Sequence, residues 1–337
     1  MKIPELFSDP FREHALTTVR GPLQLLGGRF RFESNSHQLL GLVDSAYARL
    51  PRQRLTADAP NLRVGLVLTS REAGRSRFGP PALATFSGAG LVGGASGSSN
   101  VVMVSPEARS ALVAVSAAML RFPYHTRYEL IEFAVYTLAA RVRQLVSLHA
   151  ACVGRDGRGL LLMGASGAGK STVALQCLLQ GLEFVSEDST LVAPDTMLAT
   201  GVANFLHVRS DSLRWTAQAR DVAAIRGSPV ITRRSGVKKF EIDLRLWGHR
   251  LATSPLKLAS VVFLSAKSAA RGRILNPLSR RELVARLTAT QVYAAKQPHW
   301  AVFCQKAARL GAFELRRGRH PLEAVEALHE LLRIRPR

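Results

Sequence analysis

The sequence predicts an α/β protein in which a strand, a glycine-rich loop and a helix follow one another near the middle of the chain. The loop is GASGAGKS at 164–171, which matches the pattern G-x-x-x-x-G-K-[ST]. The apolar stretch GLLLMG precedes it as a strand, and STVALQCLLQ follows it as a helix that ends at Gly181. A further apolar strand, LHAACVG, leads into GLLLMG through GRDGR, whose Asp-Gly pair predicts a β-hairpin.

The first third of the chain predicts a small α+β module. We expect strands at 29–34, 62–69 and 100–105 and a helix from the N-cap Ser36 to before Pro51. An amphipathic helix at 127–146 is expected to follow the module and to lead into the loop-containing domain. The segment at about 71–100 is rich in glycine and serine and is expected to be a mobile loop. We place a domain boundary near residue 125, which gives a module at 1–125 and a loop-containing domain at 126–337.

A second glycine pattern lies inside that glycine-rich segment. GAGLVG at Gly88–Gly93 fits G-x-G-x-x-G, the pattern of dinucleotide-binding loops, and Glu107 follows at a suitable distance. The pattern indicates such a site only where it opens a helix after a strand. Here it runs into GASGSSN, which is turn chemistry. The sequence therefore argues against a dinucleotide site at this place.

Length, composition and charge set the class of protein. A chain of 337 residues with 47% hydrophobic and 21% charged residues is typical of a globular protein of one large or two ordinary domains. The net charge is +22, and its arginines are spread along the whole chain. That spread argues against a nucleic-acid partner, whereas a nucleotide or an acidic peptide explains the positive sign equally well.

Cysteine usage and the N-terminus bear on the compartment. The three cysteines lie far apart without a CxxC pair, so we expect buried, reduced thiols and neither a disulfide framework nor a zinc site. The N-terminal stretch MKIPELFSDPFREHAL lacks the apolar core of a signal peptide. Since no run approaches 18 uncharged apolar residues, we expect a cytoplasmic protein with no membrane partner.

The central loop has the features of a P-loop. Its backbone N–H groups and the following helix N-terminus make an anion site, and its glycines permit the dihedral angles that this requires. Lys170 is expected to reach the β- and γ-phosphates of a nucleotide, and Ser171 to place a hydroxyl on Mg²⁺. The residues expected to bind the nucleotide are Gly164, Ala165, Ser166, Gly167, Ala168, Gly169, Lys170, Ser171 and Thr172.

Two acids follow the next strand. Glu187 and Asp188 end the stretch LEFVSED, and we expect this strand to lie beside the loop strand, so that both carboxylates face the phosphates. One carboxylate then suits a metal-linked role and the other the role of a base. The later apolar strand at 258–267 ends in Ser265 and carries no acid. The alternative is a solvated strand end.

The stretch SLHAACVGRDGRGLLLMGASGAGKSTVALQCLLQGLEFVSED resembles the catalytic core of the HPr kinase/phosphorylase superfamily. The resemblance covers about 45 residues closely and implies an ATP- and Mg²⁺-dependent serine kinase with a P-loop core related to that of phosphoenolpyruvate carboxykinase. It also implies that His149 lies near the phosphate, that Asp188 is the base, and that Glu187 takes the place of an aspartate as a metal residue.

The chain also departs from the sugar-responsive members of that superfamily. Their glycine-arginine signature after the acidic pair is replaced by GVANFLHVRSDSLRW and TRRSGVKKFEIDL. The chain looks closer to divergent members that phosphorylate a serine or threonine of a precursor peptide. The resemblance thus implies a protein or peptide partner, and we expect the module at 1–125 to serve substrate recognition or regulation.

Five basic residues are candidate phosphate or substrate contacts. TRRSGVKKF contains a glycine and a serine among its charges, and a mobile basic loop can neutralise charge during phosphoryl transfer. A solvated charge run is the alternative. The candidates are Arg209, Arg233, Arg234, Lys238 and Lys239.

Two hypotheses of function remain open on the sequence. The first is a kinase that transfers the γ-phosphate to a protein or peptide hydroxyl, and the adjacent acids favour it. The second is a regulatory or scaffold protein that uses nucleotide binding as a conformational signal, and the many arginines leave a version associated with nucleic acid open. Two amphipathic helices, at 279–296 and 321–334, are expected to pack; the second docks on the sheet or on another copy of the chain.

Overall fold

The computed structural model describes residues 16–56, 58–70, 79–269 and 273–333. The chain divides into two compact units, here called unit 1 (Met1–Ala48 and Thr56–Gln144) and unit 2 (Arg49–Leu55 and Leu145–Arg337). Both are mixed α/β structures built on mixed sheets. Residues 1–15, on which the expectation about targeting depends, lie outside the described residues. Among the helices that the structure describes, none has the length and apolar character needed to cross a membrane.

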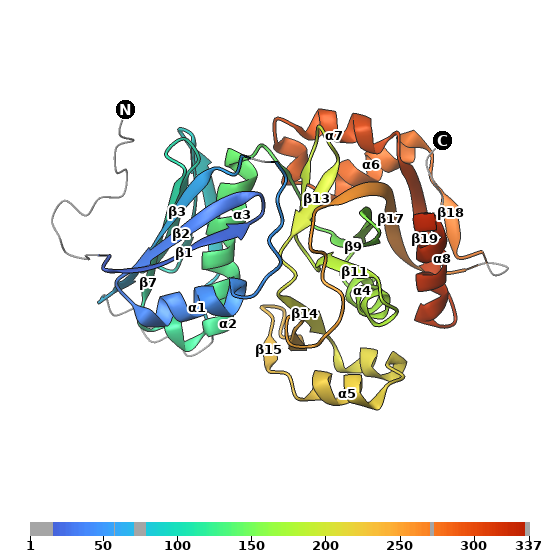
Figure 1. The fold of residues 1–337 in the computed structure, drawn as a ribbon, viewed down its shortest axis with the longest axis horizontal. Coiled ribbons are helices and arrows are strands. Elements are labelled where there is room, and N and C mark those ends of the chain that lie inside the picture. Colours follow the sequence, from blue (N-terminus) through green and yellow to red (C-terminus); the bar gives the residue numbers. More distant parts are fainter. Residues whose placement is uncertain (1–15, 57, 71–78, 270–272, 334–337) are drawn as a thin grey trace. The chain divides into compact units, whose positions relative to one another are not determined.

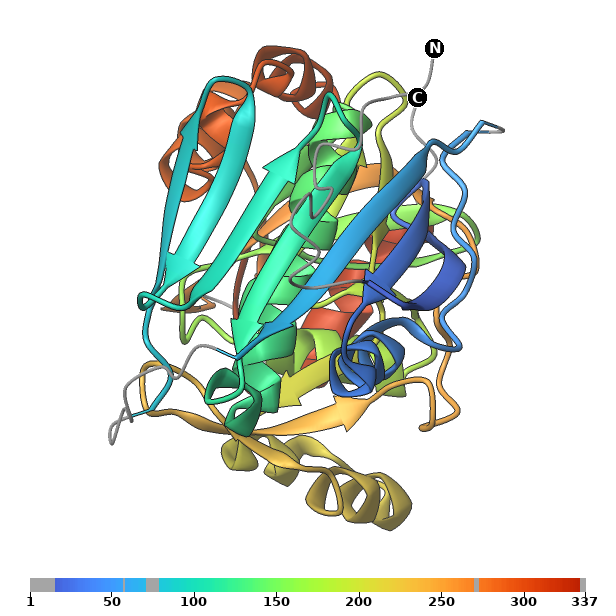
Figure 2. The same ribbon diagram turned by 90° about the vertical axis from the view of Figure 1, so that its left-hand side faces the viewer.

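Unit 1 consists of a seven-stranded sheet with helices packed on it (Figure 2). The strand order is β1-β2-β3-β7-β6-β5-β4, with β2, β3 and β7 parallel and the other pairs antiparallel. Its elements are β1 (Thr18–Leu25), β2 (Gly28–Ser34), α1 (His37–Tyr47), β3 (Asn61–Thr69), β4 (Leu83–Gly88), β5 (Leu91–Ser96), β6 (Asn100–Ser105), β7 (Ser110–Ser116), the 3-10 helix η1 (Met119–Arg121), α2 (Pro123–His125), the π-helix η2 (Thr126–Ile131) and α3 (Glu132–Val142).

Local sequence signals place the first elements of unit 1 correctly. The strands expected at 29–34, 62–69 and 100–105 are β2, β3 and β6. Ser36 caps α1, because its hydroxyl accepts a hydrogen bond from the backbone N–H of Leu39 at 3.4 Å. The helix ends at Tyr47, before the predicted stop at Pro51.

The glycine-rich segment differs from the expected mobile loop. Its described part, 79–100, contains the hairpin of β4 and β5, while 71–78 lie outside the described residues. Ala89 and Gly90 make the two-residue turn with φ of 49° and 78°, the left-handed values that a tight hairpin turn needs. GAGLVG therefore spans a strand end, a turn and the start of the next strand, and it does not open a helix.

The helix expected at 127–146 belongs to unit 1, so the boundary lies between Gln144 and Leu145 and not near 125. The helical segment starts earlier, at Pro123, includes the π-turn and ends at Val142. Apolar residues on one face of α3, such as Val135 and Leu138, are fully buried, and the helix packs on β3, β6 and β7. This packing ties the helix to the N-terminal strands.

Unit 2 is built on a nine-stranded sheet with helices on both faces (Figure 1). The strand order is β11-β9-β10-β17-β13-β12-β8, with β19 on β17 and β18 on β19, and a separate sheet has the order β14-β16-β15. Its elements are β8 (Val146–Leu148), β9 (Ala151–Arg155), β10 (Arg158–Met163), α4 (Lys170–Leu179), β11 (Glu183–Ser186), β12 (Thr190–Ala193), β13 (Leu198–Gly201), β14 (Phe205–Val208), η3 (Ser210–Trp215), α5 (Ala219–Arg226), β15 (Val230–Thr232), β16 (Lys238–Asp243), β17 (Leu256–Ser268), β18 (Leu275–Pro277), α6 (Arg280–Thr290), η4 (Ala294–Lys296), α7 (Trp300–Ala307), β19 (Gly311–Arg317) and α8 (Pro321–Arg333).

The central strands of unit 2 are buried on both faces. Along β10, Leu160 and Leu162 face a core shared with α4 and α8, whereas Leu161 and Met163 face a core shared with α6 and α7. Continuous apolar strands of this kind are typical of parallel sheets covered on both sides, and β10, β17 and β19 are indeed parallel. The helix expected at 321–334 is α8, and it docks on the sheet of its own unit.

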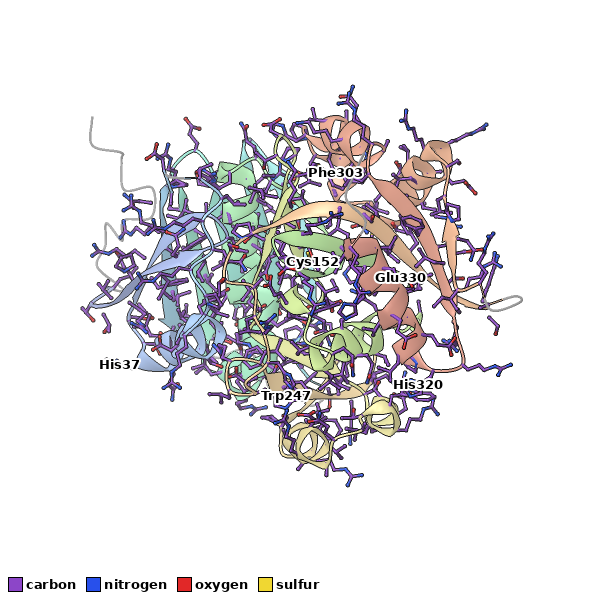
Figure 3. All side chains as sticks on the ribbon, turned by 45° about the vertical axis from the view of Figure 1, so that its right-hand side comes forward. His37, Cys152, Trp247, Phe303, His320 and Glu330 are labelled. Carbon is purple, nitrogen blue, oxygen red and sulfur yellow. The ribbon has the colours of Figure 1, made fainter. Side chains whose placement is uncertain are left out.

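The three cysteines are reduced and buried, as expected, and all lie in unit 2. Cys152 lies on β9 in the interior of the unit (Figure 3). Burial raises the pKa of the Cys152 thiol to about 12 and that of Cys304 to about 11. These thiols are therefore packing residues.

Candidate functional site

The loop at 164–169 connects β10 to α4, in the position that the sequence predicts. Ala165, Ser166 and Gly167 are exposed, whereas Lys170 is buried at the first position of the helix. Gly169 has φ of 98°, a left-handed value that a side chain would oppose, and this turns the chain into the helix. The backbone N–H groups at the start of α4 are thus presented at an open loop, which is the arrangement of an anion site.

The acidic pair follows β11, but this strand does not lie beside β10 as expected. The antiparallel strand β9 lies between them, paired with β10 on one side and with β11 on the other. Two antiparallel steps leave β10 and β11 running in the same direction, so both strands end at the same edge of the sheet. Glu187 and Asp188 therefore come near the loop in spite of the intervening strand.

Lys170 and Asp188 form an ion pair at this edge, between Nζ and Oδ1. The same Nζ lies 3.5 Å from the backbone carbonyl oxygen of Glu187, and Arg233 Nη2 lies 3.5 Å from Asp188 Oδ2. Burial alone would raise the pKa of Asp188, but Lys170, His149 and Arg233 outweigh it and hold the pKa well below its usual range. Asp188 is consequently ionised and is held by the lysine of the loop.

Glu187 is buried and contacts the second residue of α4. Its Oε1 accepts a hydrogen bond from Ser171 Oγ at 2.9 Å. Its Oε2 accepts from the backbone N–H of His207 at 3.0 Å and lies 2.7 Å from His207 Nδ1. Burial opposes ionisation, yet the charge and hydrogen bond of His207 prevail and lower the pKa of Glu187. Glu187 is thus an ionised carboxylate with both oxygens engaged.

Ser171 and Glu187 fit a small divalent cation. Two neighbouring ligands of octahedral Mg²⁺, each 2.0–2.1 Å from the ion, are about 2.9 Å apart. Ser171 Oγ and Glu187 Oε1 are separated by 2.9 Å. Hydroxyl and carboxylate oxygens are also the ligand types that Mg²⁺ prefers, and the ion takes its remaining ligands from water and phosphate. Within the described residues, no group of three or more His, Cys, Asp and Glu side chains is placed to hold a metal by itself.

His149 lies on the loop between β8 and β9, with its side chain exposed. Its backbone is fixed at both ends by the buried side chain of Gln291, which accepts from His149 N–H at 2.7 Å and donates to His149 C=O at 3.3 Å. Partial desolvation and the charge of Lys170 lower the pKa of the imidazole, although Asp188 opposes them. His149 is thus an electrostatic neighbour of the Lys170–Asp188 pair.

The basic candidates are not gathered in one place. TRRSGVKKF forms the hairpin of β15 and β16, not an irregular loop, with Gly236 at φ of 78° in the turn. Arg233 reaches Asp188, and the half-buried Lys239 has its pKa lowered by burial in spite of Glu187. Arg234 and Lys238 are exposed. Arg209 is exposed as well and pairs with Asp211 at 3.4 Å, so no contact joins it to the acidic pair.

Sequence reasoning missed three residues of the site. His207 and Glu241 face each other across β14 and β16, and Gln291 follows α6. A polar residue at a buried position of a short strand was the available signal, since FLHV and KKFEID place His207 and Glu241 among apolar neighbours. Gln291 has no comparable signal, because its role depends on a loop more than a hundred residues earlier in the chain.

Comparison with known proteins gives distant structural similarity, of which one solved structure is an example. No protein-family model matches the sequence, and no curated protein matches it. Among solved structures, the chain is similar to the structure of the Hpr(Ser) kinase/phosphatase from Coxiella burnetii, with 13% identity and a TM-score of 0.27. The match covers 55% of this chain and 90% of that chain. At such low values the chemistry of this chain has to follow from its own residues.

Proposed function

We propose that unit 2 is a kinase that binds ATP and Mg²⁺ at residues 164–172 and transfers the γ-phosphate to a serine or threonine hydroxyl of a protein or peptide. One observation carries the proposal: Lys170 and Ser171, which begin the loop helix, each contact one member of the acidic pair Glu187–Asp188. A cation for phosphate, a hydroxyl for a metal, a metal carboxylate and a base are the groups that phosphoryl transfer requires.

In this proposal Asp188 changes partner when the nucleotide binds. Lys170 has its ammonium on Asp188 in the nucleotide-free protein, and phosphate oxygens compete for it. Once Lys170 turns to the phosphates, the pKa of Asp188 rises toward its ordinary range. The carboxylate then orients the acceptor hydroxyl and takes its proton while the hydroxyl oxygen bonds to the γ-phosphorus and the bond to ADP breaks.

The remaining residues have supporting roles. Ser171 and Glu187 would hold Mg²⁺, which would neutralise charge on the phosphates. Arg233, now paired with Asp188, is placed to follow Lys170 toward the transferred phosphoryl group. His149 adds a neighbouring imidazole whose lowered pKa favours the neutral form. We propose further that the exposed Arg234 and Lys238 attract an acidic peptide segment next to the acceptor residue.

The test compares Lys170→Ala with Lys257→Ala, an exposed lysine on β17 whose backbone pairs with Arg158 at the opposite end of β10. Binding of Mg-ATP is measured by calorimetry, and phosphoryl transfer by intact-mass analysis of a library of serine- and threonine-containing peptides. We expect Lys170→Ala to abolish transfer and weaken binding, and Lys257→Ala to change neither. Full activity in Lys170→Ala would refute the site. Nucleotide binding without transfer in the parent protein would favour the regulatory hypothesis.

A further inference from the structure

A buried histidine joins the acidic pair to a carboxylate that the proposed mechanism does not use. His207 on β14 has Nδ1 at 2.7 Å from Glu187 Oε2 and Nε2 at 3.0 Å from Glu241 Oε1. Glu241 lies on β16 directly opposite His207 in the antiparallel register. All three residues are at most 9% exposed. The chain of contacts therefore runs from Ser171 through Glu187 and His207 to Glu241.

This arrangement costs desolvation free energy, which is hard to explain if the three side chains only fill the core. Two carboxylates and an imidazole leave water here, and buried ionic groups often stabilise a fold less than apolar residues of the same volume. A neutral imidazole donates from one nitrogen only, yet both nitrogens face carboxylate oxygens. The ring is therefore held between two carboxylates, one at each nitrogen.

Glu187 needs such an anchor because its side chain is long. A glutamate side chain has one more rotatable bond than an aspartate side chain, so fixing its carboxylate in one orientation costs more conformational entropy. The backbone N–H and Nδ1 of His207 both lie within hydrogen-bond distance of a single oxygen, Oε2. Two donors on one oxygen fix the plane of the carboxylate and leave Oε1 directed at Ser171.

We propose that His207 is a positioning residue for phosphoryl transfer, which holds Glu187 in the orientation that binds the metal and is itself held by Glu241. The inference rests on the proposed function, since the metal serves a nucleotide. Removing a residue that hydrogen-bonds to a metal ligand typically lowers metal affinity or activity by about 10- to 100-fold. His207 is expected to act in this way through Glu187, without touching substrate.

The experiment measures metal binding separately from turnover. Mn²⁺ affinity is followed by electron paramagnetic resonance in the presence of a non-hydrolysable ATP analogue, and binding of the analogue without metal by calorimetry in EDTA. His207→Ala should weaken Mn²⁺ binding by about tenfold or more, while metal-free binding of the analogue stays within about twofold. His207→Gln should recover part of the loss because its amide offers one donor. Glu241→Gln should have a smaller effect, since its carbonyl still accepts from Nε2.

His249→Gln is the matched control. The side chain of His249 is 13% exposed and faces the buried carboxylate of Asp221 at 3.5 Å. No contact joins it to Glu187 or Asp188. The variant His249→Gln should leave Mn²⁺ affinity unchanged. If His207→Ala and His207→Gln lower the melting temperature as His249→Gln does but keep parental Mn²⁺ affinity, His207 is structural and the inference is wrong. Where His207→Ala fails to fold, His207→Gln and Glu241→Gln decide by the same criterion. A parent protein that binds no analogue at all would overturn the proposed function itself, and the inference with it.

Discussion

In unit 1, the acidic side chains of Glu33 and Glu129, which have little exposure, pair with close neighbours. Glu33 on β2 meets Arg63 on the adjacent strand β3 at 2.6 Å, and His125 meets Glu129 one helical turn later at 2.9 Å. Such pairs form as soon as the local element or strand pair forms. Unit 2 differs in one buried cluster, whose members come from α4, from the end of β11, from β14 and from β16 and meet at one edge of the sheet.

The difference indicates which buried charges are candidates for a functional role. A charge paired with its neighbour can be explained by the stability of the element that holds it. Charged groups from distant elements lose hydration free energy when they are buried together, and only their mutual attraction offsets this loss. A purely structural role therefore explains such a cluster less well. Lys170, Glu187, His207 and Glu241 are of the second kind.

The cysteines give a probe that reports on unit 2 alone. With its pKa raised to about 12, Cys152 should react with iodoacetamide at pH 8 at least about a thousandfold more slowly than in the guanidinium-denatured chain, because both burial and the low thiolate fraction protect it. Labelling is followed by mass spectrometry of the peptides. A rate in native protein equal to that of the denatured chain would show that the core around β9 is open.

Replacing Asp188 should separate binding from chemistry. Asp188→Asn keeps the size of the side chain but cannot take a proton, so transfer should fall by about 100-fold or more. ATP affinity should stay within several-fold, because Lys170 and Ser171 remain. Turnover and affinity are measured on one preparation, with Asp156→Asn in the exposed hairpin turn as the control. Normal turnover would remove the base assignment, and loss of ATP binding alone would recast Asp188 as a metal ligand.

Acid should weaken unit 2 through the same carboxylate. The folded pKa of Asp188 lies below its unfolded value near 3.9, so its contribution is present above pH 4 and is lost as the pH falls through the folded pKa. In the nucleotide-free protein, the melting temperature of the parent should therefore fall more steeply below pH 4 than that of Asp188→Asn. Parallel curves would show that the ion pair with Lys170 adds no stability.

The segment at 49–55 should contribute to the stability of unit 2 although it lies within the N-terminal third of the sequence. Gln53 is buried, donates to the carbonyl of Ala252 at 2.9 Å and accepts from Thr200 Oγ1 at 2.6 Å. Gln53→Ala leaves both partners buried without a hydrogen bond, at a cost of about 2 kcal/mol. All three tryptophans lie in unit 2, so urea melts followed by tryptophan fluorescence measure it. The control Gln297→Ala removes one long hydrogen bond, at 3.3 Å to the carbonyl oxygen of Tyr293, and should have little effect. Equal urea midpoints for the two variants would contradict the assignment of 49–55 to unit 2.

The smallest effect is expected at the exposed basic residues of the β15–β16 hairpin. Arg234→Ala with Lys238→Ala should lower activity on acidic peptides a few-fold and flatten its dependence on salt, because surface charges act mainly through screened attraction. The melting temperature should not change. Activity that is unaltered at every salt concentration would identify these residues as a solvated face.

Sequence alone was sufficient for the elements whose signals are local. The strand, loop and helix around Lys170 and the cap at Ser36 depend on residues only a few positions apart. The same is true of the acidic pair, since Glu187 and Asp188 are adjacent and end the next strand. These features could be predicted because short-range hydrogen bonds and helix geometry decide them.

Only the tertiary structure decided which distant residues meet. It placed β9 between the two strands expected to be neighbours, brought Arg233 but not Arg209 to the acids, and moved the boundary between the units past α3. It also set His207 against Glu241, which is 34 residues away in the chain. The register between distant strands depends on how whole elements bury their apolar faces together, and no local pattern in the sequence contains that information.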